Sequence, residues 1–414
     1  MIPAIRFRLA SLREAHRPLF WVLFTGELIA STGRFMVYPF FAIYVHERLG
    51  ASLTTVGLLI AGSSLTGLLA QSVAGPLVDR FGRRGVLVVT LALDIAGLVA
   101  FAFANSLAMM AVLMLVFGLV GGIPSLAIGT MVADVTPSPR RQEAYGLLRI
   151  ATNAGAAVGP AVGGFVAGVS YFWAFIIAAT ATLVYLLLII FRTTETRPLV
   201  EATLEGDQAS LGYGHLLRDG PFLAFCGASI LMSLAYAIPW VLLSVHLKTN
   251  YRIPENMFGF LVTINALMVV FFQFPIARWL ARFPKMPVMV AAALFYALGA
   301  GSIAFFDRYL LFVLSMVVIT VGELLASPTA SAYVADVAPL DMRGRYMAAF
   351  FLTWGIAFGV GPVLGGWLND TFGPAAMWQG AMAFGLVSAL AFLALGGLVR
   401  AIQPSAPAAS EPIE

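Results

Sequence analysis

Apolar residues run along the chain in twelve stretches of about 20 residues or more, the length that a helix needs to cross a bilayer. Short polar or charged segments interrupt these stretches, so the pattern predicts twelve transmembrane helices. Six lie near residues 19–44, 52–78, 86–104, 107–135, 143–169 and 171–191, and six near residues 221–247, 256–278, 287–305, 309–337, 341–368 and 373–400. Between the two sets, the long polar stretch at residues 192–220 is expected to be a cytoplasmic linker.

An internal repeat relates the two sets of helices. Residues 132–164 and 334–366 align without a gap at an offset of 202 residues; both copies open with V-A-D-V-x-P and close with V-G-P-x-x-G-G. A repeat of half the chain length indicates duplication of one structural unit. In a membrane protein it is typical of transporters whose halves rock against each other around a shared central site.

The fold class that follows is an all-α membrane protein with two six-helix bundles related by pseudo-two-fold symmetry. We expect the first bundle within residues 1–191 and the second within residues 221–414. Composition agrees, because 60% of the residues are apolar, only 11% are charged, and mean hydropathy is +0.93. A water-soluble domain could not keep so much apolar surface buried.

Charge and cysteine content narrow the range of functions. The net charge is +4, and no basic run with interleaved aromatic residues points to nucleic acid. Cys226 is the single cysteine, and the four histidines are scattered, so we expect no disulfide and no metal site. The sequence contains no recognisable nucleophile–base constellation and no phosphate-binding loop. We therefore expect neither a cofactor nor enzymatic activity.

The distribution of basic residues predicts the orientation. With the N-terminus in the cytoplasm, 18 of the 24 lysines and arginines lie inside, four lie outside and two fall within helices. Since cytoplasmic loops are enriched in basic residues, both termini are expected in the cytoplasm, with the chain in the inner cell membrane. Four arginines among apolar residues in the first 18 positions predict an interfacial amphipathic helix rather than a cleaved signal peptide.

The loop between the second and third predicted helices reads G-P-L-V-D-R-F-G-R-R. Glycines permit a tight turn and a close backbone approach, and an aspartate can pair with nearby arginines or face a helix N-terminus. A short basic loop that only orients the chain would need no aspartate. We therefore interpret the loop as a cytoplasmic latch between the halves, formed by Gly75, Asp79, Arg80, Gly82, Arg83 and Arg84. It resembles the G-x-L-x-D-R-x-G-R-R/K loop of the major facilitator superfamily.

The fifth predicted helix carries a glycine pattern made of Gly146, Gly155, Gly159, Pro160, Gly163 and Gly164. Three of these glycines fall at i, i+4 and i+8, so they form a smooth stripe against which another helix can pack closely. The proline removes one backbone hydrogen bond and bends the helix. The pattern resembles the motif of the drug:proton antiporter branch of that superfamily, which implies export. Ordinary small-residue packing is the alternative.

Five ionisable residues fall well inside predicted helices: Glu27, Arg34, Asp94, Arg149 and Glu323. A charge at membrane depth costs about 2.5–3.5 kcal/mol even on the lenient insertion scale, so such groups normally face a cavity and pair or titrate. Glu27 and Arg34 are seven residues apart on one helix face. We expect them to line one cavity, at a separation too large for a direct ion pair.

Glu323 is the acid of a G-E-x-x-x-x-P segment that runs from Gly322 to Pro328. The segment resembles LmrP-like multidrug transporters, in which the acid serves cation binding and proton coupling. We take Glu323 as the principal candidate and Glu27 as the second. Asp94 is equally well explained by a structural hydrogen bond, and Arg149 by a structural ion pair. Antiporters of this branch often carry an arginine in the fourth helix, four residues before a glycine. In this chain the candidate positions hold Phe117 and Gly118, so that arginine is absent.

The resemblance covers all twelve helices and implies a proton-coupled exporter of amphipathic small molecules, either cationic or neutral. Its partners would be those substrates, protons and membrane lipids, and we expect a monomer. Uptake of a metabolite by proton symport, export or flipping of a lysolipid, and a non-transporting scaffold or sensor on the same fold are the alternatives. A scaffold would have no use for titratable groups inside the membrane.

Overall fold

The computed structural model describes residues 18–137, 140–197, 216–339 and 342–402. The amphipathic helix predicted within the first 18 residues lies outside these ranges, as does most of the predicted linker. Within them, twelve helical spans are long and apolar enough to cross a membrane, and they coincide with the twelve predicted ones. The chain is therefore an integral membrane protein that crosses the membrane many times, and the predicted all-α fold class is confirmed.

The first span consists of α2 (Pro18–Val37), the short 3-10 helix η1 (Tyr38–Phe40) and α3 (Phe41–Leu49). The next five are α4 (Leu53–Phe81), α5 (Arg83–Ala102), α6 (Leu107–Gly121) with α7 (Ile123–Val135), α8 (Arg141–Val169) and α9 (Tyr171–Arg192). The last six are α11 (Gly220–Tyr251), α12 (Glu255–Leu280), α13 (Lys285–Ser302) with η3 (Ile303–Phe305), α14 (Tyr309–Val337), α15 (Arg343–Phe372) and α16 (Pro374–Ile402).

Local sequence explains where several of these helices begin and break. Ser52 and Ser106 accept hydrogen bonds from backbone N–H groups three residues on, so they cap α4 and α6. Pro39 and Pro124 each lie in the first turn of a new helical segment, where a missing N–H does no harm. They interrupt the first and fourth spans, which the apolar pattern alone shows as continuous.

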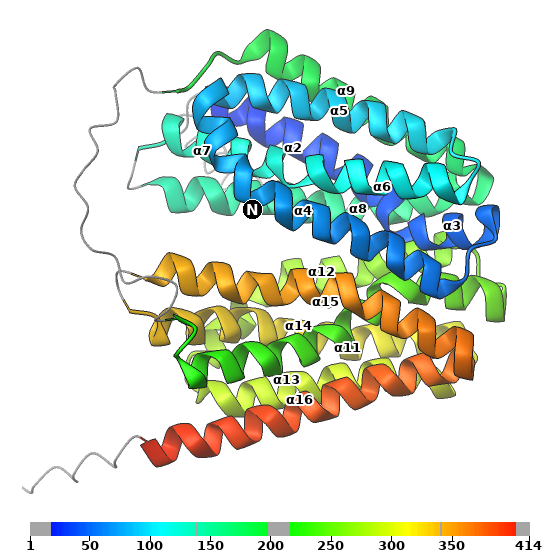
Figure 1. The fold of residues 1–414 in the computed structure, drawn as a ribbon, viewed down its shortest axis with the longest axis vertical. Helices are drawn as coiled ribbons and strands as arrows, with labels where there is room; N and C mark the ends of the chain where they lie inside the picture. The colour runs from blue at the N-terminus through cyan, green and yellow to red at the C-terminus, as the bar shows by residue number, and fades with distance from the viewer. Residues whose placement is uncertain (1–17, 138–139, 198–215, 340–341, 403–414) are drawn as a thin grey trace, which may run out of the picture.

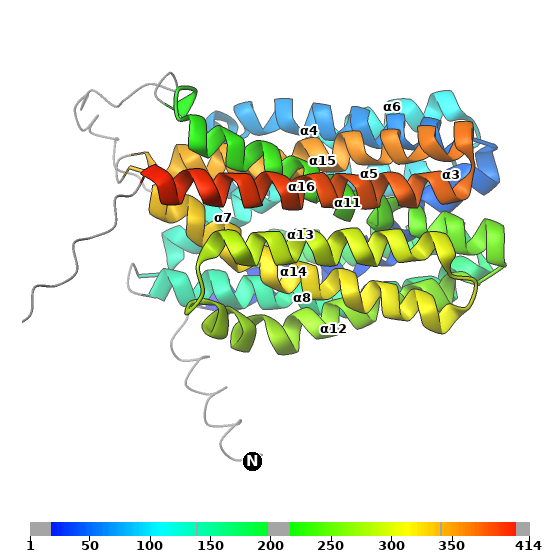
Figure 2. The same cartoon turned by 90° about the horizontal axis from the view of Figure 1, so that it is seen from below.

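The helices gather into two groups (Figure 1). Helices α2–α9, here called the first half, lie in the upper part of the view, and α11–α16, the second half, lie below. Across the halves α4 packs against α15, α8 against α12, and α11 against α3 and η1. Figure 2 shows α4 next to α15 and α8 next to α12 from a second direction. These pairs form the surface along which the two halves meet.

The two ends of the bundle are distinguished by their connections. The α3–α4 end contains the turn at residues 50–52 and the starts of α9 and α12; the α4–α5 end contains Gly82 and the start of α15. An apolar cluster extends through both halves, and toward the α3–α4 end the rings of Phe40 and Phe258, one from each half, lie 5.9 Å apart within it. Many large apolar side chains on the outside are exposed, as expected for helices that face lipid.

Candidate functional site

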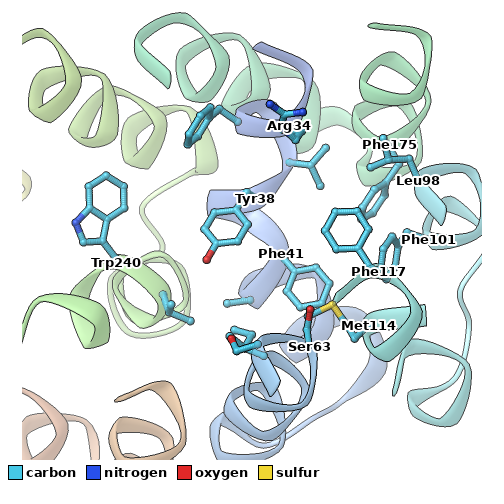
Figure 3. Close-up of a pocket in the computed structure, with 16 residues that line it drawn as sticks. Arg34, Tyr38, Phe41, Ser63, Leu98, Phe101, Met114, Phe117, Phe175 and Trp240 are labelled. Carbon is cyan, nitrogen blue, oxygen red and sulfur yellow. The ribbon is translucent and has the colours of Figure 1, made fainter. Parts of the chain in front are cut away.

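A cavity of about 370 Å³ lies where the two halves meet. Most of its wall comes from the first half, and Trp240 and Val241 of α11 contribute from the second half (Figure 3). Seven of its side chains are aromatic: Phe35, Tyr38, Phe41, Phe101, Phe117, Phe175 and Trp240. Arg34 is the charged residue among those that line it. The volume suits a drug-sized molecule, and the wall is apolar apart from a few polar groups.

Arg34 and Glu27 form a direct ion pair, with 2.7 Å between Nη2 of the arginine and Oε1 of the glutamate. The expectation that they are too far apart to pair was therefore wrong. A separation of seven residues corresponds to about 10.5 Å along the helix, but both side chains lie on one face and bend toward each other. Thr152 of α8 donates a second hydrogen bond to the same glutamate oxygen, at 3.3 Å.

Glu323 of α14 lies in a polar cluster in the second half. Asn265 of α12 donates a hydrogen bond of 2.8 Å to Glu323 Oε2, and the Tyr236 hydroxyl of α11 donates another. The ring of Tyr236 contacts the ring of Trp240 at 5.6 Å, and Trp240 lines the cavity. Glu323 does not itself line the cavity, so it reaches the wall only through these two aromatic residues.

Asp94 and Arg149 occupy different surroundings. Asp94 of α5 is buried, with 7% of its surface exposed, beside the Thr182 hydroxyl of α9. Arg149 of α8 is exposed, and among the described residues no carboxylate lies within ion-pair distance of it. The structure thus brings Glu27 and Arg34 together and leaves Asp94 and Arg149 outside the cavity wall.

The predicted latch loop contacts its own half. Arg83 lies 3.2 Å from Asp134 of α7 and 3.6 Å from Asp79, whose side chain is 72% exposed. Gly82 has a φ of +86°, which favours glycine, and a Cβ there would collide with the carboxylate of Glu195. A Cβ on Gly75 would meet nothing within 4 Å, so no close approach requires that glycine. Asp336 is the counterpart of Asp134 in the second repeat, 202 residues on. It pairs with Lys285 rather than with an arginine.

Glu195, at the start of the linker, is a contact that the sequence analysis missed. It accepts hydrogen bonds of 3.0 and 3.1 Å from the backbone N–H groups of Arg83 and Arg84, at the N-terminus of α5. Partial burial acts to raise the pKa of this carboxyl, but the backbone N–H groups of Arg197, Arg83, Thr196 and Arg84 outweigh it and hold the pKa below 4.5. An acidic residue just beyond the sixth span, on the same side as the α5 N-terminus, was the available signal.

The glycine stripe of α8 packs against α2 of the same half. A Cβ on Gly155 or Gly159 would strike the backbone of Thr32, and one on Gly163 would strike Met36. Gly164 faces α12 instead, against Asn256. Gly146 meets nothing within 4 Å, so it does not belong to this packing surface. The rest of the pattern thus serves two interfaces, one within the first half and one across the halves.

Four glycines form a symmetric contact between the halves, here called the glycine seal. Gly57 of α4 packs on Pro362 of α15, and 202 residues on, Gly259 of α12 packs on Pro160 of α8. In the same way Gly366 packs on Leu53, and Gly164 packs on Glu255. The absent side chains let the backbones approach closely. The V-G-P-x-x-G-G repeat therefore packs each half against the other toward the α3–α4 end.

Two carboxylates strengthen this seal, and both belong to the second half. Asp370 of α15 accepts hydrogen bonds from the backbone N–H and the hydroxyl of Thr54, at 2.8 and 2.6 Å. Glu255 of α12 accepts one from the Tyr171 hydroxyl at 3.0 Å and pairs with Lys248 at 3.0 Å. Sequence reasoning did not select either acid, because both lie at span ends where charged residues are common.

Comparison with known proteins gives a consistent picture. The chain is 27% identical over 358 residues to the uncharacterized MFS-type transporter YhjO of Bacillus subtilis, which covers 84% of this chain and 86% of that protein. It is 28% identical over 372 residues to a Na(+), Li(+), K(+)/H(+) antiporter of Planococcus maritimus, and the alignment covers 83% of this chain and 87% of that protein. It is 26% identical over 370 residues to the multidrug resistance protein MdtH of Aeromonas hydrophila, and the alignment covers 87% of this chain and 89% of that protein.

The fold is shared with solved transporters. The crystal structure of the nucleoside transporter NupG superposes with a TM-score of 0.75 at 16% identity, covering 92% of this chain and 99% of that one. The profile of the Major Facilitator Superfamily matches residues 23–239 and 225–414, which together span most of the chain. With twelve spans, a duplicated six-helix unit and this match, the chain belongs to the Major Facilitator Superfamily.

Proposed function

We propose that this protein is a proton-coupled antiporter that exports amphipathic small molecules by alternating access. One observation carries the proposal: an aromatic cavity of about 370 Å³ lies at the meeting surface of the halves, beside a glycine seal built from the internal repeat. Two carboxylates at membrane depth are connected to the cavity wall, Glu27 by its ion pair with Arg34 and Glu323 through Tyr236 and Trp240. An apolar cavity with adjacent titratable groups is what a carrier of greasy cargo and protons requires.

The seal supports alternating access. The contacts that glycines make between α4 and α15 lie between Leu53 and Leu68 of α4, in the part of that helix toward the α3–α4 end. With the cytoplasmic orientation that the basic residues favour, the sealed α3–α4 end faces outward, and we infer that the cavity is loaded from the cytoplasm. Export then requires the glycine seal to part and the latch loop to engage the second half at the other end.

Proton coupling runs through Glu323. As a carboxylate it accepts hydrogen bonds from Asn265 and Tyr236, which holds the Tyr236 ring against Trp240 in the cavity wall. Protonation removes one acceptor and releases this arrangement. Cargo therefore binds best while Glu323 is ionised, whereas a bound proton stabilises the neutral state. This competition is sufficient to couple the movement of cargo in one direction to the movement of protons in the other. Glu27 is the second candidate for the proton site, since it lies directly behind Arg34.

The names of relatives favour export, because they include a multidrug resistance protein and a cation/proton antiporter. Symport of a defined metabolite would call for more fixed polar groups than Ser63, Ser64 and the Tyr38 hydroxyl add to the wall. A lysolipid exporter would share the apolar cavity and remains the second reading. A scaffold or sensor would not need the buried carboxylates.

The proposal is tested by proton release from purified protein in weakly buffered detergent, on addition of aromatic dyes. The wild-type protein should release protons as a dye binds, and Glu323→Gln should release none while still binding the dye. Glu27→Gln, the matched variant in the other half, should retain release if Glu323 alone carries the proton. Full release from both single variants would exclude both carboxylates as the coupling group.

A further inference from the structure

We propose that Arg34 determines the charge of the cargo: the cavity selects molecules with an aromatic body and one anionic group, which binds the Arg34 guanidinium. This deepens the proposed function by naming a substrate class for its cavity. It also replaces the expectation of a cationic cargo held by Glu323, because that carboxylate does not line the cavity.

The charge of the wall points in this direction. Arg34 is the charged group among the lining residues, and 34% of its side chain remains exposed despite its contact with Glu27. The glutamate partner is only 11% exposed and lies behind it. A cargo molecule entering between the aromatic rings therefore meets the guanidinium first. A cation would find rings that attract it but an arginine that repels it.

Arg34 also has spare bonding capacity. A guanidinium carries five N–H donors in a rigid fork, and the ion pair with Glu27 occupies one nitrogen, Nη2. Hydrogen bonds between an arginine and a carboxylate or sulfonate are strong in an apolar surrounding. If the cargo draws Arg34 away, Glu27 keeps the Thr152 hydroxyl as a donor, so it is not left without a partner.

Apart from Tyr38, whose hydroxyl belongs to the cavity wall, the described charged and titratable groups around the pair do not line the cavity. Asp94 on α5 lies in the field of Arg34 but is buried beside Thr182. Tyr185 on α9 lies near Glu27 and is fully buried. The rest of the wall supplies the aromatic body's binding surface, with Phe101 and Phe175 stacked on each other at 5.8 Å. Flat apolar molecules bury well against such rings.

The experiment uses three probes with one body: 2-naphthoate, 2-naphthalenemethanol and 2-naphthalenemethylammonium. Equilibrium binding to the purified full-length protein in detergent is measured by titration calorimetry. Wild-type protein should bind the carboxylate about tenfold or more tightly than the alcohol, and the ammonium most weakly, because a hydrogen bond to a charged group contributes that much. Arg34→Gln should weaken the carboxylate about tenfold and leave the alcohol nearly unchanged.

Glu27→Gln gives an opposite and more diagnostic change. Removing the competitor for Arg34 should tighten the carboxylate severalfold and weaken the ammonium. Arg278→Gln, which removes an exposed arginine on α12, is the matched control and should change none of the three affinities. If Arg34→Gln fails to give a monodisperse protein, Arg34→Lys keeps the charge without the fork and should retain part of the preference.

Three results would overturn the inference: tighter binding of the ammonium by wild type, equal weakening of all probes in Arg34→Gln, or weaker carboxylate binding in Glu27→Gln. These measurements involve no proton gradient. If proton coupling is not found, the binding data still decide whether Arg34 selects anions. If binding does not depend on the charge of the probe, the proposed antiport is still tested separately by proton release.

Discussion

A Cβ atom on Gly57 of α4 would lie 2.6 Å from the carbonyl oxygen of Pro362 in α15, so the two backbones touch across the halves. The same contact recurs 202 residues on, between Gly259 and Pro160. The internal repeat thus explains more than ancestry. Each copy of V-G-P-x-x-G-G packs against the other half, so parting the halves at this end requires both copies to release together.

Bulky side chains in the glycine seal should hold the α3–α4 end open. Gly57→Leu and Gly259→Leu should each raise the labelling rate of a cysteine at Ser63 in the cavity, by about tenfold, when a membrane-impermeant maleimide is added outside cells. The background is Cys226→Ser. Gly227→Leu, where a Cβ meets nothing within 4 Å, is the control and should label like the parent. Unchanged labelling in both seal variants would show that these contacts do not close the cavity.

The glycine stripe of α8 should tolerate no side chain where it meets α2. Gly159→Leu places atoms against Phe35 and Thr32, so it should reduce transport by more than about tenfold while the protein still inserts. Gly146→Leu in the same helix is the control, because a Cβ there meets nothing within 4 Å. Dye export by cells is the measurement. Equal export by the two variants would show that close packing of Gly159 against α2 is not required for transport.

Asp79→Asn should slow transport severalfold and leave equilibrium binding of 2-naphthoate within about twofold of wild type. Asp79 is exposed and pairs only loosely with Arg83 in this state, so its main role would come when the opposite state forms. Initial rates in proteoliposomes, set beside calorimetric binding, separate the two effects. If Asp79→Asn transports at the wild-type rate, the latch role is wrong and the loop only orients the chain in the membrane.

The Glu195 contact should show a pH dependence of defined sign. Because the folded state holds the pKa of Glu195 below 4.5, ionisation of this group stabilises the fold above that value and stops doing so as pH falls through the lowered pKa. Glu195→Gln should therefore have a lower Tm than wild type, by an amount that is constant from about pH 8 to pH 5 and shrinks below about pH 4. Thermal unfolding in detergent measures it. A difference that grows as the pH falls would contradict the assignment.

The sequence predicted the spans because the membrane imposes a length and a composition on each one. It also predicted that Glu27 and Arg34 share a helix face, but not their pairing. That pairing depends on side-chain direction, which residue spacing does not determine. The partners of Glu195, Glu255 and Asp370 come from helices distant in sequence. No local pattern marks them, since acidic residues at span ends are common and only the packing of the halves brings Thr54 and Tyr171 to them.

Proton flux in proteoliposomes tests the central claim most directly. Purified protein is reconstituted with a pH-sensitive dye inside, and a panel of aromatic dyes of each charge, a sugar and a lysolipid is added outside in turn. The account predicts that an inward gradient of an amphipathic aromatic compound drives protons outward, that the sugar has no effect, and that Glu323→Gln abolishes the flux. Protons moving in the same direction as the compound, or no proton movement with any member of the panel, would contradict it.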